Sequence, residues 1–284
     1  MNQNSLYQEI KDIFQKTVFI VLSILILKSI ISCMREIHAE KHPAIPVKQV
    51  NEGLHFKHWY TIFGKNCDLE ATLETYIKKN FIGKKFSRIW HMWGWGTHDS
   101  GCAIAIVQDK KIEDFFPYWC GSQYEPYTIA EITEWSHIGN LEAIVEVGHP
   151  SGCRLDFFAT DYAINKHRYK SQKVVNANIV GLVYNMTAFD LDAINNNQSG
   201  LKFSNDFCCY LPANDEPDLI NYVGKILTFR EYKWDTIPGY VVSLSLTPNF
   251  VLDVFIAKNN LEVELVEGKQ VKGNLWLIGR LRKN

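Results

Sequence analysis

Residues 155–158 read Leu-Asp-Phe-Phe, and residues 252–255 read Leu-Asp-Val-Phe. Each tetrapeptide follows an alternating apolar and polar stretch and a turn that contains a proline. A glycine lies at nearly the same distance beyond the two aspartates, Gly181 after 25 positions and Gly279 after 26. Agreement in both order and spacing indicates that residues 128–284 hold two copies of one β-rich unit.

The two copies predict a mainly β fold. Each holds four or five short strands in about 60–70 residues, with turn residues every ~8–14 positions, which is typical of a small closed or partly closed barrel. We therefore expect two tandem barrels with the same strand order, at residues 128–200 and 215–284. An oligonucleotide/oligosaccharide-binding (OB-like) barrel is the closest match, and an SH3-like barrel is the alternative. The polar stretch before the last strand of each copy is expected to contain no helix.

Strand alternation also predicts which side chains of the repeated motif are buried. Leu155 and Phe157 of the first copy, and Leu252 and Val254 of the second, are expected to point inward. The aspartate between each pair is expected not to be buried without a partner, because an unpaired buried carboxylate is costly.

Two stretches of the repeats can be compared with known proteins. Residues 156–166 read DFFATDYAINK and are followed by Val-Gly-Leu at 180–182, and residues 271–281 read VKGNLWLIGRL. Both stretches resemble segments of uncharacterised bacterial proteins with small OB-like barrel domains. The resemblance covers roughly half the chain, and it implies a fold type without a known activity or catalytic residues.

The region before the repeats, residues 34–127, is predicted to mix helix and strand. Residues 68–80 place apolar side chains on one helical face, with Asp68 as the amino-terminal cap. Residues 102–107 are continuously apolar, which predicts a buried strand. An α-helix-containing segment is therefore expected to precede the two barrels.

Residues 1–33 contain the most apolar stretch of the chain. A hydrophobic helix over residues 13–33 is just long enough to span a bilayer, and the basic residues that follow it place the main domain in the cytoplasm. Two alternatives stay open. Cys33 ends a lipobox-like sequence, which indicates a lipoprotein signal, and Met34 as the true start would give a cytoplasmic protein.

Composition disfavours one class of partner. The formal net charge is −1, whereas a nucleic-acid-binding protein usually carries a basic surplus, so nucleic acid is not favoured. The 7 cysteines form no Cys-x-x-Cys pair, which removes the common zinc-ribbon and redox spacings. Reduced, buried cysteines fit this pattern and a cytoplasmic location.

The segment WHMWGWGTHDSGC at residues 90–102 is rich in tryptophan and in metal-ligand residue types. Trp93 and Trp95 are candidates for stacking on a ligand. An alternative places a metal ion on four side chains that suit zinc, which are His91, His98, Asp99 and Cys102. The spacing of seven between the histidines fits no common zinc pattern. We therefore expect no metal or other cofactor and a structural loop made tight by its glycines.

A basic and aromatic patch lies in the first copy. Lys166, Arg168 and Tyr169 are candidate ligand-binding residues, because OB-type barrels bind by combining stacking with cationic side chains. The second copy is acidic at the corresponding place, so a solvated turn is the alternative interpretation.

No convincing catalytic constellation emerges along the chain. The sequence therefore predicts a non-catalytic binding or interaction protein for an unknown protein or small ligand, tethered to the membrane through residues 13–33. One alternative is a hydrolase or metal-dependent enzyme with its site around residues 91–102. Another is an immunity-type inhibitor that occludes a protein partner.

Overall fold

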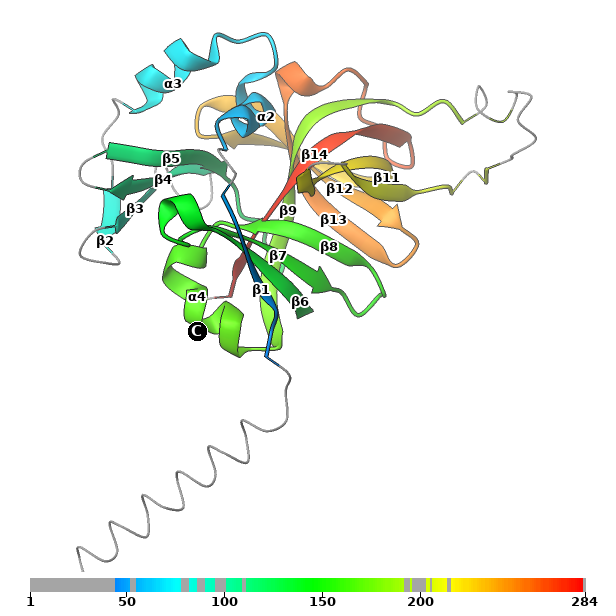
Figure 1. Ribbon diagram of the computed structural model, residues 1–284. Coiled ribbons are helices and arrows are strands. Elements are labelled where there is room, and N and C mark those ends of the chain that lie inside the picture. The colour runs from blue at the N-terminus through cyan, green and yellow to red at the C-terminus, as the bar shows by residue number, and fades with distance from the viewer. Residues whose placement is uncertain are drawn as a thin grey trace, which may run out of the picture. The chain divides into compact units, whose positions relative to one another are not determined.

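A computed structural model describes most of the chain after residue 43 (Figure 1). The described residues are 44–51, 55–77, 82–85, 90–94, 101–108, 111–191, 195, 203–204, 206–213 and 216–282. All strands and helices named below belong to one unit that begins at Ile45. The hydrophobic helix predicted at residues 13–33 lies outside the described residues. Within the described ranges, no helix combines the length and apolar character that crossing a bilayer requires.

The fold is mainly β, as predicted, and the described strands form two sheets. The ten-stranded sheet contains β1 (Val47–Val50), β6 (Glu125–Trp135), β7 (Ala143–Gly148), β8 (Arg154–Ala159), β9 (Val174–Ala188), β10 (Cys209–Ala213), β11 (Glu216–Trp234), β12 (Ile237–Thr247), β13 (Phe250–Ala257) and β14 (Gln270–Leu281). The four-stranded sheet contains, in spatial order, β2 (Ile82–Lys85), β3 (Trp90–Gly94), β4 (Cys102–Gln108) and β5 (Lys111–Tyr118). The helical elements are η1 (Phe56–Trp59), α2 (Tyr60–Phe63), α3 (Leu69–Ile77), η3 (Ser136–Ile138), α4 (Tyr162–Ser171) and η4 (Lys258–Asn260).

The strands of the first copy, together with one strand of the second copy, form a closed circuit of hydrogen-bonded neighbours. β6, β7 and β8 pair antiparallel in sequence order, and β9 returns to pair with β6. This spatial order of fourth, first, second and third strand is a Greek key. The circuit closes through β14 of the second copy, which runs parallel to β8 and antiparallel to β9. We name the circuit β6–β7–β8–β14–β9 the first ring.

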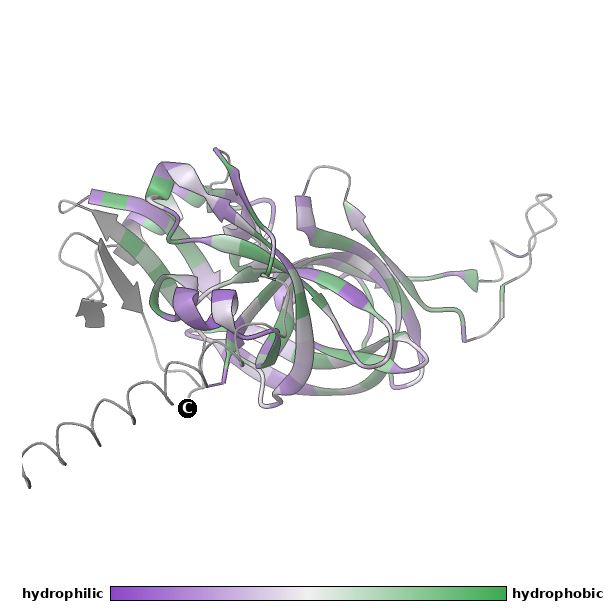
Figure 2. Cartoon of the chain, turned by 60° about the horizontal axis from the view of Figure 1, so that its bottom comes forward, coloured by the Kyte–Doolittle hydropathy of each residue, from purple (hydrophilic) through white to green (hydrophobic). Residues whose placement is uncertain are grey.

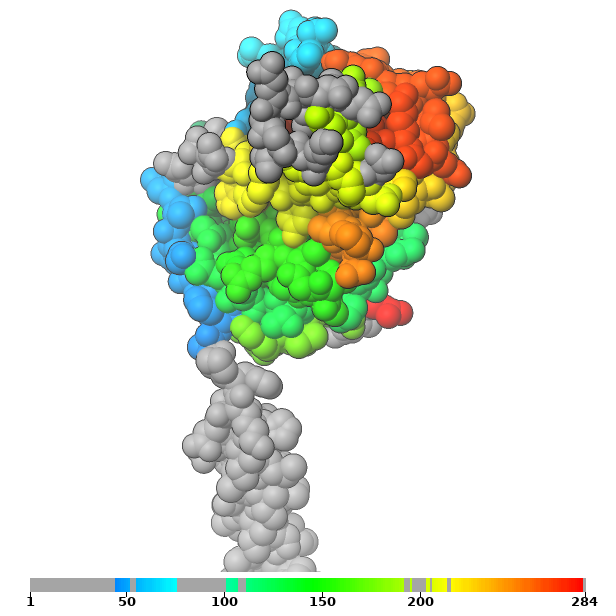
Figure 3. Space-filling model, turned by 90° about the vertical axis from the view of Figure 1, so that its right-hand side faces the viewer, coloured from blue at the N-terminus to red at the C-terminus, as the bar shows by residue number. Residues whose placement is uncertain are grey.

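The second copy repeats this arrangement, and here the first copy supplies the closing strand. β11, β12 and β13 pair antiparallel in sequence order, and β14 returns to pair with β11. β9 of the first copy runs parallel to β13 and closes this second ring. The strand order is the same in the two copies, but the prediction also excluded helices from them, and the first copy contains α4 (Tyr162–Ser171). The two predicted barrel ranges, 128–200 and 215–284, are joined through the shared strands β9 and β14, which lie at the centre of Figure 1. Figure 3 shows the two copies in contact, the first green and the second yellow to orange.

The register between β9 and β14 is symmetric. Val180 pairs with Ile278, and these residues immediately precede the two glycines of the repeated spacing. Gly181 pairs with Leu277, and Gly279 pairs with the residue before Val180. A pseudo-twofold axis therefore passes through the Val180–Ile278 pair and relates the two copies.

The region before the first ring combines helix and strand, as predicted. α3 begins at Leu69, directly after Asp68, whose carboxylate accepts a hydrogen bond from the Ala71 amide over 3.1 Å. β4 covers the apolar run predicted as a strand at residues 102–107. At the edge of the large sheet, β1 pairs parallel with β6.

Helix α4 contradicts the expectation that the polar stretch of the first copy contains no helix. The second copy has only the short η4 after its third strand. Contacts with the body of the protein hold α4 in place. The Tyr169 hydroxyl donates to Asp161 over 2.7 Å, and Lys166 and Lys170 pair with the buried carboxylate of Glu134 at 2.8 and 3.0 Å. Sequence periodicity did not reveal the helix because these partners lie outside it.

The burial of the repeated motif follows the prediction, and Figure 2 shows hydrophobic residues along the ring strands. The four motif residues expected to point inward are each at most 2% exposed, and they are Leu155, Phe157, Leu252 and Val254. Asp253 is half-buried and accepts a hydrogen bond from the Ser243 hydroxyl over 2.6 Å. Asp156 is also half-buried, and Glu146 is its cross-strand neighbour on β7.

Candidate functional site

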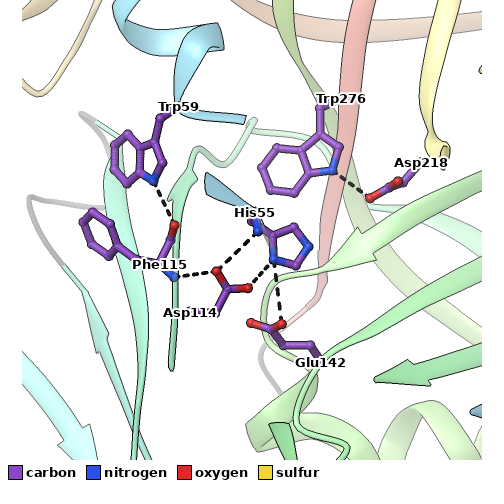
Figure 4. A network of polar contacts seen from close by, with 7 residues as sticks. All are labelled: His55, Trp59, Asp114, Phe115, Glu142, Asp218 and Trp276. Atoms are coloured by element: carbon purple, nitrogen blue, oxygen red, sulfur yellow. Dashed lines mark hydrogen bonds and ion pairs between the residues drawn. The ribbon is translucent and has the colours of Figure 1, made fainter. Parts of the chain in front are cut away.

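Three titratable side chains meet in the interior of the protein (Figure 4). His55 immediately precedes η1, Asp114 lies in β5, and Glu142 immediately precedes β7. Each side chain is at most 3% exposed. One imidazole nitrogen and one oxygen of each carboxylate all lie within 4.8 Å of one another. We name these three residues the His55 cluster.

Asp114 is held by several donors. His55 Nδ1 is hydrogen-bonded to Asp114 Oδ2, and the backbone N–H groups of His55 and Phe115 donate to Asp114 Oδ1 over 3.4 and 2.7 Å. The Trp59 indole N–H donates to the Phe115 carbonyl over 2.8 Å. These bonds attach the segment around η1 to β5, so the His55–Asp114 contact forms where two parts of the fold are joined.

Glu142 has no comparable set of donors. Its Oε2 lies 3.7 Å from His55 Nδ1, which is within ion-pair range but too long for a hydrogen bond. Apart from the adjacent Asp114 carboxyl, no described group forms a hydrogen bond with the Glu142 carboxyl. Buried polar groups are normally satisfied, because leaving one unpaired costs about 1–3 kcal/mol and more when the group is charged.

The environment separates the two carboxyl groups in protonation. Burial raises the pKa of Glu142 well above its usual value, and the negative charge of Asp114 raises it further. Burial also acts to raise the pKa of Asp114, but the charge and hydrogen bond of His55 outweigh it, and the net pKa is lowered. The environment therefore holds a proton more tightly on Glu142 than on Asp114.

Aromatic rings enclose the His55 imidazole. Those with ring centroids within 5.5 Å of it include Phe116, Trp135, Phe158 and Trp276. Both copies of the repeat contribute rings, because Phe158 lies in β8 and Trp276 lies in β14. The His55 cluster therefore lies against the junction of the two copies, in surroundings of low polarity.

A second buried histidine extends this packing. His58 stacks on Trp276 with ring centroids 3.9 Å apart and an interplanar angle of 6°, and its Nδ1 is hydrogen-bonded to the Tyr184 hydroxyl over 2.6 Å. Burial lowers the pKa of His58 well below its usual value, and the positive charges of neighbouring groups lower it further. The Trp276 indole N–H donates to the buried carboxylate of Asp218 over 2.7 Å.

The side chains of the His55 cluster are at most 3% exposed, and they lie outside four cavities that described residues line. Ligand pockets are normally concave and open to solvent, and a substrate must reach the reacting groups. In this buried position the cluster can hold a proton or a small cation.

A groove of about 610 Å³ lies on the second ring. Side chains of β11, β12 and β13 line it, together with residues 119–123, which connect β5 to β6. Its lining combines aromatic rings with groups that form hydrogen bonds, including Trp119, Thr228, Phe229, Arg230, Tyr232 and Asp253. We name it the β11–β13 groove. Arg230 lies over the Tyr232 ring at 5.3 Å, which leaves a flat cationic surface on β11.

The predicted Trp-rich site falls mostly outside the described residues. Trp95, His98 and Asp99 are not described, and Trp93 and His91 lie on β3 without a description of their side chains. Cys102 is buried at the start of β4. Both the stacking hypothesis and the alternative zinc hypothesis for this segment therefore stay predictions.

The predicted patch on the first copy lies on α4 and makes internal contacts. The Lys166 ammonium pairs with Glu134 and donates to the Asn140 carbonyl over 3.0 Å. Arg168 Nη1 donates to the Arg282 carbonyl over 2.9 Å, and the Tyr169 ring is fully buried. None of the three predicted residues lines one of the four cavities.

Sequence reasoning missed both the His55 cluster and the β11–β13 groove. His55 and Asp114 are 59 positions apart and belong to segments with no shared motif. The groove depends on which face of β11 to β13 is left uncovered, and local periodicity does not specify that. The one usable signal was the ordinary expectation that a histidine flanked by apolar and aromatic residues is buried and needs a partner.

Comparison with known proteins adds no relative: no family model, curated protein or solved structure matches the chain. The geometry described above is therefore the basis for the functional inference.

Proposed function

We propose that this chain is a non-catalytic binding protein whose ligand occupies the β11–β13 groove. The groove is the observation that carries the proposal. Its volume of about 610 Å³ falls within the ~300–1,000 Å³ range of small-molecule sites. Its floor is made of paired strands, which hold the lining side chains in fixed relative positions.

The strand arrangement supports an OB-like assignment for each ring. A five-stranded Greek-key barrel defines that fold class, and ligands of such barrels bind across the face of the second and third strands. In the second ring these strands are β12 and β13, and Val241, Ser243 and Asp253 from them line the groove. The proposed site thus lies on the face that this class of barrel uses for oligonucleotides and oligosaccharides.

The lining favours a hydroxyl-rich ligand with one flat apolar face, which is the chemistry of a carbohydrate. Phe229 is 38% exposed and offers a surface for stacking. Thr228, Arg230 and Asp253 offer a hydroxyl, a guanidinium and a carboxylate for hydrogen bonds to hydroxyl groups. Placing the ligand here, and not on α4, agrees with the internal contacts that already engage Lys166 and Tyr169.

The proposal keeps the membrane span that the sequence predicts at residues 13–33, with the main domain in the cytoplasm. Carbonate extraction of membranes from cells that express the full chain tests it, and a spanning protein is expected to stay in the membrane fraction. The enzyme alternative would place its site around residues 91–102, and the inhibitor alternative would use a protein partner. Neither has a supporting contact among the described residues.

Tryptophan fluorescence of the full chain in mild detergent tests the groove, because Trp119 lines it. The probe is a panel of mono- and oligosaccharides. At least one member is expected to bind saturably, and Arg230→Ala is expected to weaken that binding by about tenfold or more, because hydrogen bonds to charged groups contribute about 1.5–3 kcal/mol.

Arg154→Ala is the matched control, since Arg154 is an exposed arginine on a strand of the first ring and its loss changes the charge equally. The control should bind like the unmodified protein. The proposal is wrong if no sugar saturates the signal, or if both arginine variants lose affinity to the same extent.

A further inference from the structure

Glu142 is one of the buried polar side chains whose presence the packing of the described residues does not explain. Its side chain is 2% exposed, it points into the His55 cluster, and apart from the Asp114 carboxyl no described group forms a hydrogen bond with it. An apolar residue of similar size would avoid this cost. A carboxylate at this position therefore needs a partner that can bind its oxygen atoms.

The donor set of the cluster identifies the class of that partner. One imidazole nitrogen and two carboxylates face a common point, and their ligand atoms lie within 4.8 Å of one another. Metal binding requires both carboxylates to be deprotonated, and a divalent cation would neutralise their two negative charges and leave His55 as a neutral ligand.

We propose that His55, Asp114 and Glu142 bind one zinc ion. Zinc accepts nitrogen and carboxylate oxygen ligands in a tetrahedral site, in which three protein ligands leave the fourth position for a water molecule. Calcium requires about 6–8 oxygen ligands and magnesium keeps several waters, so neither suits three protein donors among aromatic rings. The nitrogen ligand and the surroundings of low polarity distinguish this site from the exposed acidic clusters that such hard cations prefer.

The ion would join three parts of the fold that are distant in sequence. His55 precedes η1, Asp114 belongs to the four-stranded sheet, and Glu142 leads into β7 of the first ring. Aromatic rings from both copies pack around the same point. Binding free energy at this place becomes folding free energy, because the unfolded chain does not assemble the three donors.

Metal analysis of the full chain, purified without a histidine tag or chelators, tests the proposal directly. We expect about one zinc ion per chain by elemental analysis. X-ray absorption should show nitrogen and oxygen ligands without sulfur, which separates this site from one that uses Cys102. A strong chelator is expected to lower Tm by about 5–10 °C, the shift produced by losing a ligand present at about a hundredfold over its Kd.

Glu142→Gln is the informative variant, because it keeps the size of the side chain and removes the ligand charge. It should lose the zinc and the response to chelator. Glu125→Gln is the control, since it makes the same exchange beside another histidine, His149, at 3.1 Å and near the surface. The control should keep both properties.

Two results would overturn the proposal. One is a wild-type protein that stays free of zinc after dialysis against micromolar zinc. The other is a Glu142→Gln variant that retains the ion. If Glu142→Gln does not fold, Asp114→Asn replaces it, and the wild-type stoichiometry decides the question without either variant.

Discussion

Asp156 shows how the two copies diverge at one position. It occupies the same place in its repeat as Asp253, but Glu146 faces it across the strand pair, where Ser243 faces Asp253. Burial raises the pKa of Asp156 to about 6, and the negative charges of Glu146, Asp218 and Glu131 contribute. Asp253 thus accepts a hydrogen bond from Ser243, whereas Asp156 faces the carboxylate of Glu146.

The raised pKa gives a prediction with a definite sign. The folded protein binds the Asp156 proton more tightly than the unfolded chain does, so this group favours folding below about pH 4 and loses that contribution as pH rises through about 6. Asp156→Asn is therefore expected to be more stable than the wild type above pH 7 and equally stable near pH 4. Urea unfolding across this range measures the difference.

Asp253→Asn serves as the matched control for that experiment. It should show no gain at neutral pH, because Asp253 accepts a hydrogen bond from Ser243. Equal gains in both variants would show that general charge reduction, and not the local acidic pair, explains the effect.

Residue-level inference from sequence succeeded where strand alternation alone decides the outcome. Leu155 and Val254 point inward because neighbouring strand positions must face opposite sides. The His55 cluster could not be predicted, because its members come from a loop, a strand of the small sheet and a turn. Only the packing of these elements brings the three side chains together.

At the scale of strands, the repeated aspartate-to-glycine spacing has a steric explanation. A Cβ atom on Gly279 would lie 2.6 Å from the Phe157 ring, and one on Gly181 would lie 2.9 Å from the Val254 side chain. Phe157 and Val254 follow the two motif aspartates, and each lies in the copy opposite to its glycine. The repeated aspartate-to-glycine spacing is therefore explained by two equivalent contacts, in each of which a glycine of one copy packs against a motif residue of the other copy.

Substituting these glycines tests that explanation. Gly279→Ala and Gly181→Ala should each lower the free energy of unfolding by about 1–3 kcal/mol, because the added methyl group overpacks the contact. Gly279→Ala should be the more damaging, since its neighbour is closer and bulkier. Denaturant midpoints provide the measurement.

Gly148→Ala is the control at the end of β7, where an added Cβ meets nothing within 4 Å. It should change stability by less than about 0.5 kcal/mol, as is usual for surface positions. A comparable loss in all three variants would point to a general effect of replacing glycine in strands.

The helix α4 marks the limit of element prediction. Its sequence carries several charges and no strong apolar stripe, so the pattern favoured a solvated turn. The lysines face the buried Glu134, and Tyr169 reaches Asp161, so the helix is stabilised by partners that local sequence does not reveal. The strands were easier to predict because their alternation is itself a local signal.

For the molecule as a whole, the exchange of β9 and β14 decides how the two copies depend on each other. Neither ring closes without a strand from the other copy, because β14 pairs with β8 and β9 pairs with β13. The duplication was visible in the sequence, but the exchange was not, since the same strand order could close each ring within its own copy. The shared strands also bring Phe158 and Trp276 together beside the His55 cluster.

Fragment complementation tests this exchange most directly. The chain is divided within residues 196–202, and residues 45–195 and 203–284 are produced separately and together. We expect neither fragment alone to unfold cooperatively, because each exposes the unpaired edges of an open ring. Together they should copurify in a 1:1 ratio and unfold in a single transition. Two fragments that each fold alone and do not associate would contradict the shared-strand arrangement.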